Sequence, residues 1–156
     1  MKMIASHTPG SIKRFRRTSW KFQRTFHTPL KNLEPFVAII LSSIDGLRGG
    51  HVVIDQDIGF ESRHLAPLLK RFGAAAQLER DWSIETSTPE NVQLLLQAAL
   101  GDWLDFVFVP DPSPFSIYAD HDEYCTFFAH SKSNLNRVVN RLIAAGSEVV
   151  EYRRML

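Results

Sequence analysis

The clearest pattern in the chain lies at residues 115–129, where two alternating segments flank a polar loop. The apolar members of both segments fall on odd positions: Phe115, Ile117, Ala119, Cys125, Phe127 and Ala129. Such alternation is typical of a β-strand. Both sets share one buried face only if the loop has an odd length, as with residues 121–123. The pattern therefore predicts an antiparallel hairpin in which Asp120 faces Tyr124.

Helical spacing of apolar residues recurs in four other parts of the chain and predicts helices over about 36–47, 64–72, 89–100 and 133–145. Ser87-Thr88-Pro89-Glu90 is a capping box for the third helix, and Ser131 or Ser133 is expected to cap the fourth. Short apolar or alternating runs predict strands at 51–54, 82–86, 104–109 and 148–153. We therefore expect an α+β fold, with a mixed or largely antiparallel sheet packed by helices and a C-terminal hairpin, helix and strand.

Composition is typical of one globular domain, with 156 residues and 44% hydrophobic content. No apolar run is long enough to span a bilayer and no signal peptide is visible, so we expect no transmembrane segment and a cytoplasmic location. Cys125 is the only cysteine, which excludes an intrachain disulfide. It falls on the apolar side of its strand, where we expect a buried, inert thiol.

Charge divides the chain unevenly despite a formal net charge of +1. Residues 1–34 contain eight Lys or Arg residues and one acidic residue, and we expect them to form a basic N-terminal arm, flexible or docked, beside a single α+β domain at 35–156. The arm mixes cations with aromatics, as contact with nucleic acid requires. Its candidate nucleic-acid residues are Arg14, Arg16, Arg17, Trp20, Lys21 and Arg24. The alternatives are an arm docked on its own protein or on another subunit of a homo-oligomer, a removed targeting segment, or a misassigned start.

The loop Asp120-His121-Asp122-Glu123 concentrates four titratable groups. Each is a candidate metal ligand, but adjacent loop residues diverge in direction and no second ligand group accompanies them. Glu61 and His64 match a Glu-x-x-His spacing after Asp55 and Asp57, but the element occurs once, so we interpret these as exposed charges at a helix start. We assign no metal ligands, cofactor or catalytic residue.

The sequence favours a small non-enzymatic interaction or regulatory protein that uses the acidic hairpin loop to bind a protein partner. Bacterial immunity proteins are an analogous class by size and charge. The candidate partner-binding residues are Tyr118, Asp120, His121, Asp122, Glu123, Tyr124, Arg137 and Arg141. Asp120 is expected to cap the loop, and Asp122 to adopt its left-handed conformation. One alternative is a metal-dependent hydrolase centred on the same loop, and another is a nucleic-acid-associated protein that binds through the arm.

Overall fold

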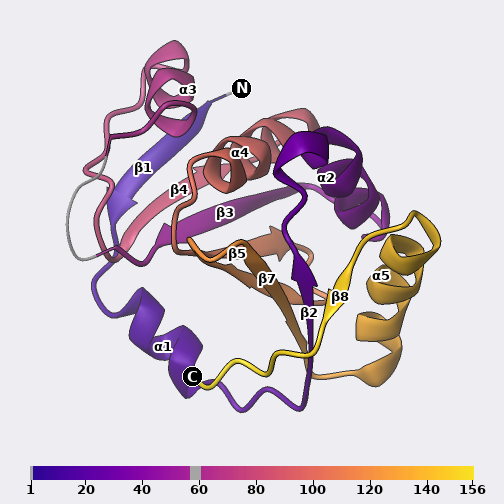
Figure 1. Ribbon diagram of the computed structural model, residues 1–156. Helices are drawn as coiled ribbons and strands as arrows, with labels where there is room; N and C mark the ends of the chain where they lie inside the picture. Colours follow the sequence, from indigo (N-terminus) through magenta and orange to yellow (C-terminus); the bar gives the residue numbers. More distant parts are fainter. Residues whose placement is uncertain (1, 57–60) are drawn as a thin grey trace.

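The computed structural model describes residues 2–56 and 61–156, which form one sheet with helices on both faces (Figure 1). The strand order is β1-β4-β3-β5-β6-β7-β2-β8, and every neighbouring pair is antiparallel. The strands are β1 (Met3–His7), β2 (Phe22–His27), β3 (Gly49–Ile54), β4 (Trp82–Thr86), β5 (Phe106–Asp111), β6 (Ser116–Ala119), β7 (Tyr124–Ala129) and β8 (Val149–Val150). The expected α+β class is confirmed.

The helices divide between the two faces of the sheet. They are α1 (Ser11–Arg17), the 3-10 turn η1 (Leu30–Asn32), α2 (Leu33–Ser42), α3 (Leu65–Arg71), α4 (Pro89–Gly101) and α5 (Lys132–Ala144). The main core joins α2, α4 and α5 to one face, and α3 packs outside on α4. On the other face of the sheet, Ile12 and Phe15 of α1 form a second core with side chains such as Val107 and Phe128. These strand residues point away from the main core because successive side chains of a strand face opposite sides of the sheet. Among the described residues, no helix is long and apolar enough to cross a bilayer.

The hairpin has the predicted register. Ala119 pairs with Cys125, and the Asp120 N–H donates to the Tyr124 carbonyl at 3.1 Å. The prediction for the left-handed residue was wrong, because Glu123 (φ 65°) takes that conformation and Asp122 does not. In a three-residue loop, the left-handed residue follows the turn and so falls last, immediately before the second strand.

Both ends of the chain join the sheet, and the last strand is shorter than predicted. Residues 3–27 supply β1, α1 and β2, and β2 lies between β7 and β8 with Phe26 fully buried. The charge boundary near residue 34 therefore does not mark an edge of the folded unit. The last strand is limited to Val149–Val150, and the tail beyond it is held through Arg154, whose backbone N–H and carbonyl both bond to the Gln23 amide.

Candidate functional site

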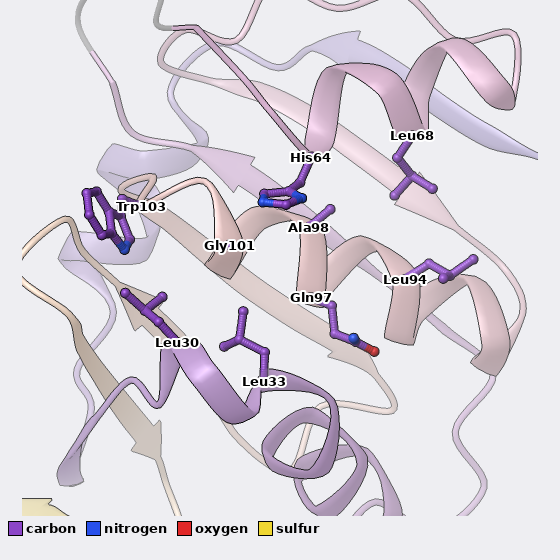
Figure 2. Close-up of a pocket in the computed structure, with 9 residues that line it drawn as sticks. All are labelled: Leu30, Leu33, His64, Leu68, Leu94, Gln97, Ala98, Gly101 and Trp103. Carbon is purple, nitrogen blue, oxygen red and sulfur yellow. The ribbon is translucent and has the colours of Figure 1, made fainter.

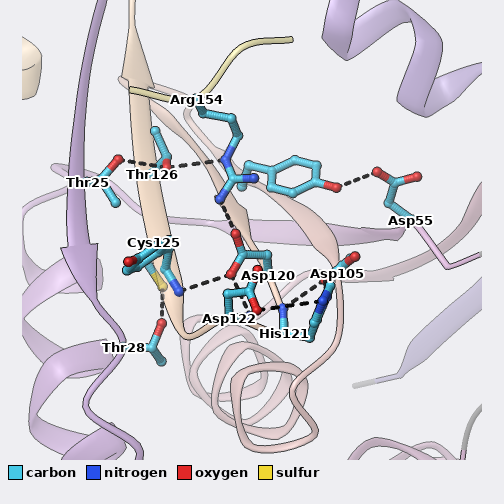
Figure 3. Close-up of polar contacts among 12 residues, drawn as sticks. Thr25, Thr28, Asp55, Asp105, Asp120, His121, Asp122, Cys125, Thr126 and Arg154 are labelled. Atoms are coloured by element: carbon cyan, nitrogen blue, oxygen red, sulfur yellow. Dashed lines mark hydrogen bonds and ion pairs between the residues drawn. The ribbon is translucent and has the colours of Figure 1, made fainter. Parts of the chain in front are cut away.

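Asp120 is a structural residue of the hairpin loop. Its carboxylate accepts from the backbone N–H groups of Asp122 (2.9 Å) and Tyr124 (3.1 Å), as expected for a cap. It also accepts from the Arg154 guanidinium, and both side chains of this ion pair are almost fully buried (Figure 3). Asp120 therefore stabilises the loop and the C-terminal tail, and little of its carboxylate is exposed for contact with a partner.

The other three loop residues point to different neighbours. His121 meets Asp105 through both its backbone N–H (2.8 Å) and Nδ1 (2.9 Å), and the hydrogen bond to Asp105 raises the pKa of His121 (Figure 3). The Asp122 side chain is 72% exposed, and that of Glu123 is 39% exposed. Among the described residues, no group of three or more His, Cys, Asp or Glu side chains is arranged to hold a metal ion.

Tyr118 lies inside the molecule, which removes it from the expected contact surface. Its hydroxyl donates to the buried Asp55 carboxylate, and Arg154 covers its ring at 4.4 Å. Burial, followed by the hydrogen bond to Asp55, raises the pKa of Tyr118 well above its ordinary value. Tyr124 is half-buried and stacks on Tyr152 at a centroid distance of 4.9 Å.

Asp55 is the buried anchor of α1. Its carboxylate accepts from Tyr118, from Arg16 at 2.7 Å and from Arg80 at 2.8 Å. Burial raises the pKa of Asp55, but the hydrogen bonds from these three donors outweigh it, so that the pKa is lowered overall. Of the other residues in the Glu-x-x-His interpretation, Glu61 and His64 are exposed, and Asp57 lies outside the described residues.

The structure does not bring the two arginines of α5 to the acidic loop. Arg137 forms a bidentate pair with Asp45 at 2.7 and 2.8 Å, and Arg141 approaches the Ser43 hydroxyl at 3.4 Å. Arg137 shares a recess with residues 112–114, which precede β6, whereas the acidic loop follows β6. The expected composite surface is therefore divided between opposite ends of that strand.

The candidate nucleic-acid residues also separate. Arg14, Arg16 and Arg17 are exposed on α1, but Arg16 is paired with Asp55. The Trp20 ring turns inward and stacks on His130 at a centroid distance of 4.6 Å. Lys21 and Arg24 are exposed around the start of β2.

A feature that the sequence analysis missed is an apolar groove of about 490 Å³ along α4, with η1 and α2 on one side and α3 on the other (Figure 2). It is lined by Leu30, Leu33, His64, Leu68, Leu94, Gln97, Ala98, Gly101 and Trp103. Trp103 is 58% exposed and Leu94 is 36% exposed. One sequence signal was present, because Leu94 falls outside the α4 stripe that contains Val92 and Leu95.

Trp103 has an unusual backbone conformation for its residue type. With φ 55°, it occupies the left-handed position after the end of α4, where helices usually carry glycine. A bulky residue is disfavoured there, and such strained positions cluster at functional sites. The protein therefore keeps a large exposed aromatic at a position that local backbone preference assigns to a small residue.

Asp102 fixes the α3 wall of the groove to the end of α4. Its carboxylate accepts from the backbone N–H groups of Arg63 (3.1 Å), His64 (2.9 Å) and Leu65 (2.9 Å), and from the Ser62 hydroxyl (2.5 Å). These groups begin α3, which otherwise has no side-chain cap of its own at His64. One carboxylate therefore holds the start of α3 against α4.

The groove and the acidic loop adjoin one another. Figure 2 shows Trp103 and Leu30 together at one end of the groove. His121 bonds to Asp105, two residues after Trp103, and the Thr28 N–H, two residues before Leu30, donates to the Glu123 carbonyl at 2.7 Å. Residues 33–45 and 89–105 contain five acidic residues and no Lys or Arg. Asp45 is paired with Arg137, however, and Asp102 and Asp105 are bound to α3 and His121. The exposed carboxylates beside the groove are therefore chiefly those of Asp122 and Glu123. The geometry thus joins an apolar recess to an acidic border.

No family model matches this chain, and neither the curated proteins nor the solved structures contain a significant match to it.

Proposed function

We propose that this protein is a non-enzymatic binding module whose partner places a basic amphipathic helix in the groove, with the helix cations beside Asp122 and Glu123. The observation that carries the proposal is the exposed Trp103, held in a left-handed conformation at the edge of an apolar recess. Tryptophan is strongly enriched among the residues that dominate binding energy at protein interfaces. An exposed tryptophan that opposes backbone preference is better explained by binding than by folding.

The shape of the groove favours a helical occupant. Its walls are helical segments, and Figure 2 shows Leu30 beside Trp103 at one end of the groove and Leu94 at the other. An amphipathic helix presents apolar residues at i, i+3, i+4 and i+7, which suits an elongated apolar recess. The apolar recess provides hydrophobic contact with the helix, and the acidic border determines which sign of charge the partner helix carries.

Charge favours a basic occupant. The two helices α2 and α4 carry no cation, and the loop adds the exposed carboxylate of Asp122 and the half-exposed one of Glu123. Exposed Lys31, Arg63 and Lys70 lie on η1 and on the α3 side, where they set the direction of a bound helix. Opposite charges at an interface border chiefly increase the association rate and the selectivity.

Two synthetic helices of about 14 residues, roughly four turns, test the proposal. Both carry Leu at i, i+3, i+4 and i+7, with Lys elsewhere in one and Glu elsewhere in the other. By fluorescence anisotropy, the Lys helix should bind saturably and more weakly as salt rises, and the Glu helix should bind at least about tenfold more weakly.

Trp103→Gly should weaken binding of the Lys helix by about tenfold or more. Ile143→Ala, which removes an exposed apolar side chain from α5, away from the groove, should leave this binding unchanged. Equal binding of the two helices, no saturable binding, or equal effects of the two substitutions would overturn the proposal.

A further inference from the structure

A second recess lies on the other face of the sheet, beneath α1. Its volume is about 280 Å³, and it is bounded by α1, by Trp20 and by strands β3, β5 and β6. It is lined by Ser11, Arg14, Phe15, Thr18, Trp20, His51, Val53, Val107, Val109 and Ser116. The volume is just below the roughly 300–1,000 Å³ of typical ligand sites, so it suits a ligand with one small ring system.

The walls of this recess are apolar and aromatic. Val53 and Val107 lie beneath α1 in the second core, and Phe15 lies 5.6 Å from the Trp20 ring by centroid distance. Val109 and Trp20 are only partly buried against that core. The recess is therefore lined by valine and aromatic side chains, which is a favourable environment for an aromatic ring.

The polar groups that line the recess include a cation but no carboxylate. Arg14 is exposed on α1, and its contacts are to the Ser11 hydroxyl at 3.0 Å and the Pro9 carbonyl at 3.4 Å. Burial lowers the pKa of His51, against the opposing charge of Glu85, so its imidazole is neutral near pH 7. Arg14 is therefore the only formal charge among the lining residues at that pH.

One further lining group, among the described residues, has an unused hydrogen-bond donor. The Trp20 Nε1–H is shielded from solvent and has no acceptor. Buried polar groups are normally satisfied, and groups left without partners beside a cavity are typical of a site that a ligand completes.

We propose that this recess binds a small aromatic carboxylate, with its ring between Phe15, Trp20 and the valines and its carboxylate on Arg14. The arginine guanidinium offers paired N–H donors that match a carboxylate. Because no acidic residue lines the recess, the positive charge of Arg14 is available to pair with an anionic ligand. This inference is independent of the groove, because the two recesses share no lining residue and belong to opposite faces of the sheet.

The probes are 2-naphthoate and its uncharged relative 2-naphthamide, each titrated into the intact protein by calorimetry. Naphthoate should bind saturably, and naphthamide about tenfold more weakly. Arg14→Gln should weaken naphthoate by about tenfold and leave naphthamide unchanged. The matched control is Arg17→Gln, which removes the same charge from the same helix outside the recess and should change naphthoate binding by less than about twofold.

Val109→Phe, at a half-exposed position that a larger ring would fill, should abolish binding of both probes while circular dichroism stays native. The proposal is overturned if naphthoate does not saturate, or if Arg14→Gln and Arg17→Gln have equal effects. It is also overturned if an oligothymidylate binds through α1 and excludes naphthoate, since the recess would then belong to a nucleic-acid surface.

Discussion

The two recesses of this protein differ in the sign of the charge around them. Two walls of the groove, α2 and α4, carry no cation, and the carboxylates of Asp122 and Glu123 lie beside it, whereas the recess beneath α1 is lined by one arginine and no carboxylate. Cations are not confined to α1, because α3 and α5, on the same face as the groove, carry Lys70, Arg71, Lys132, Arg137 and Arg141. The contrast in charge is therefore local to the two recesses and is not a division between the faces of the sheet.

The largest stability effect is expected at the anchor of α1. Asp55→Asn should lower the free energy of unfolding by about 2–3 kcal/mol, because the buried acceptor of Tyr118, Arg16 and Arg80 is weakened. This value is below that for a fully buried pair, because both arginines are about half exposed. Urea denaturation measures the change. Asp111→Asn, at an exposed ion pair, serves as the control and should leave stability unchanged.

The same residue gives a pH dependence with a defined sign. The pKa of Asp55 is lower in the folded protein than in the unfolded chain, so its contribution is present above the unfolded value of about 3.9. The contribution is lost as pH falls through the folded pKa. The stability difference between wild type and Asp55→Asn should therefore be constant from about pH 5 to 7 and shrink below about pH 4. A difference that grows on acidification would contradict the anchor.

The next largest effect concerns the wall of the groove. Asp102→Ala should cost about 1–2 kcal/mol, because it removes the acceptor for three backbone N–H groups at the start of α3. Amide hydrogen exchange should accelerate in residues 62–72 far more than in β5 or β6. If exchange rises equally across the sheet, Asp102 supports the whole fold and has no special role at the groove.

Trp103→Gly should separate binding from stability. Glycine suits the left-handed backbone, but the substitution also loses the partly buried indole, so the free energy of unfolding should change by less than about 0.5 kcal/mol. Binding of the Lys helix should nevertheless fall about tenfold. A large loss of stability would assign Trp103 to folding, and the comparison between the two recesses would lose its main support.

The sequence predicted the fold class and the hairpin register because apolar parity at 115–129 admits few arrangements. It left β2 undecided, because Phe22 and Phe26 fit the spacing of a helix as well as that of a strand. The site was less predictable. Tyr118 is buried where it meets Asp55, and the groove exists because Asp102 joins α3 to α4. Both contacts join residues that are distant in sequence, so local sequence patterns do not predict them.

The smallest stability effect is expected in the loop itself. Changing Asp122 and Glu123 together to Asn and Gln should leave the unfolding transition unchanged, because Asp122 is largely exposed and Glu123 partly so. The substitutions should weaken the Lys helix at low salt and have little effect at high salt. An equal loss at both salt concentrations would show that the loop contributes shape, not charge.

The most direct test of the account is a ¹H–¹⁵N spectrum of the indole groups of Trp20, Trp82 and Trp103 during titration with the Lys helix. The three rings report on the recess beneath α1, on the contact of β4 with His7, and on the groove. We predict that the Trp103 signal shifts saturably while those of Trp20 and Trp82 stay in place. Saturation of the protein with no shift of the Trp103 signal would contradict the proposed binding groove.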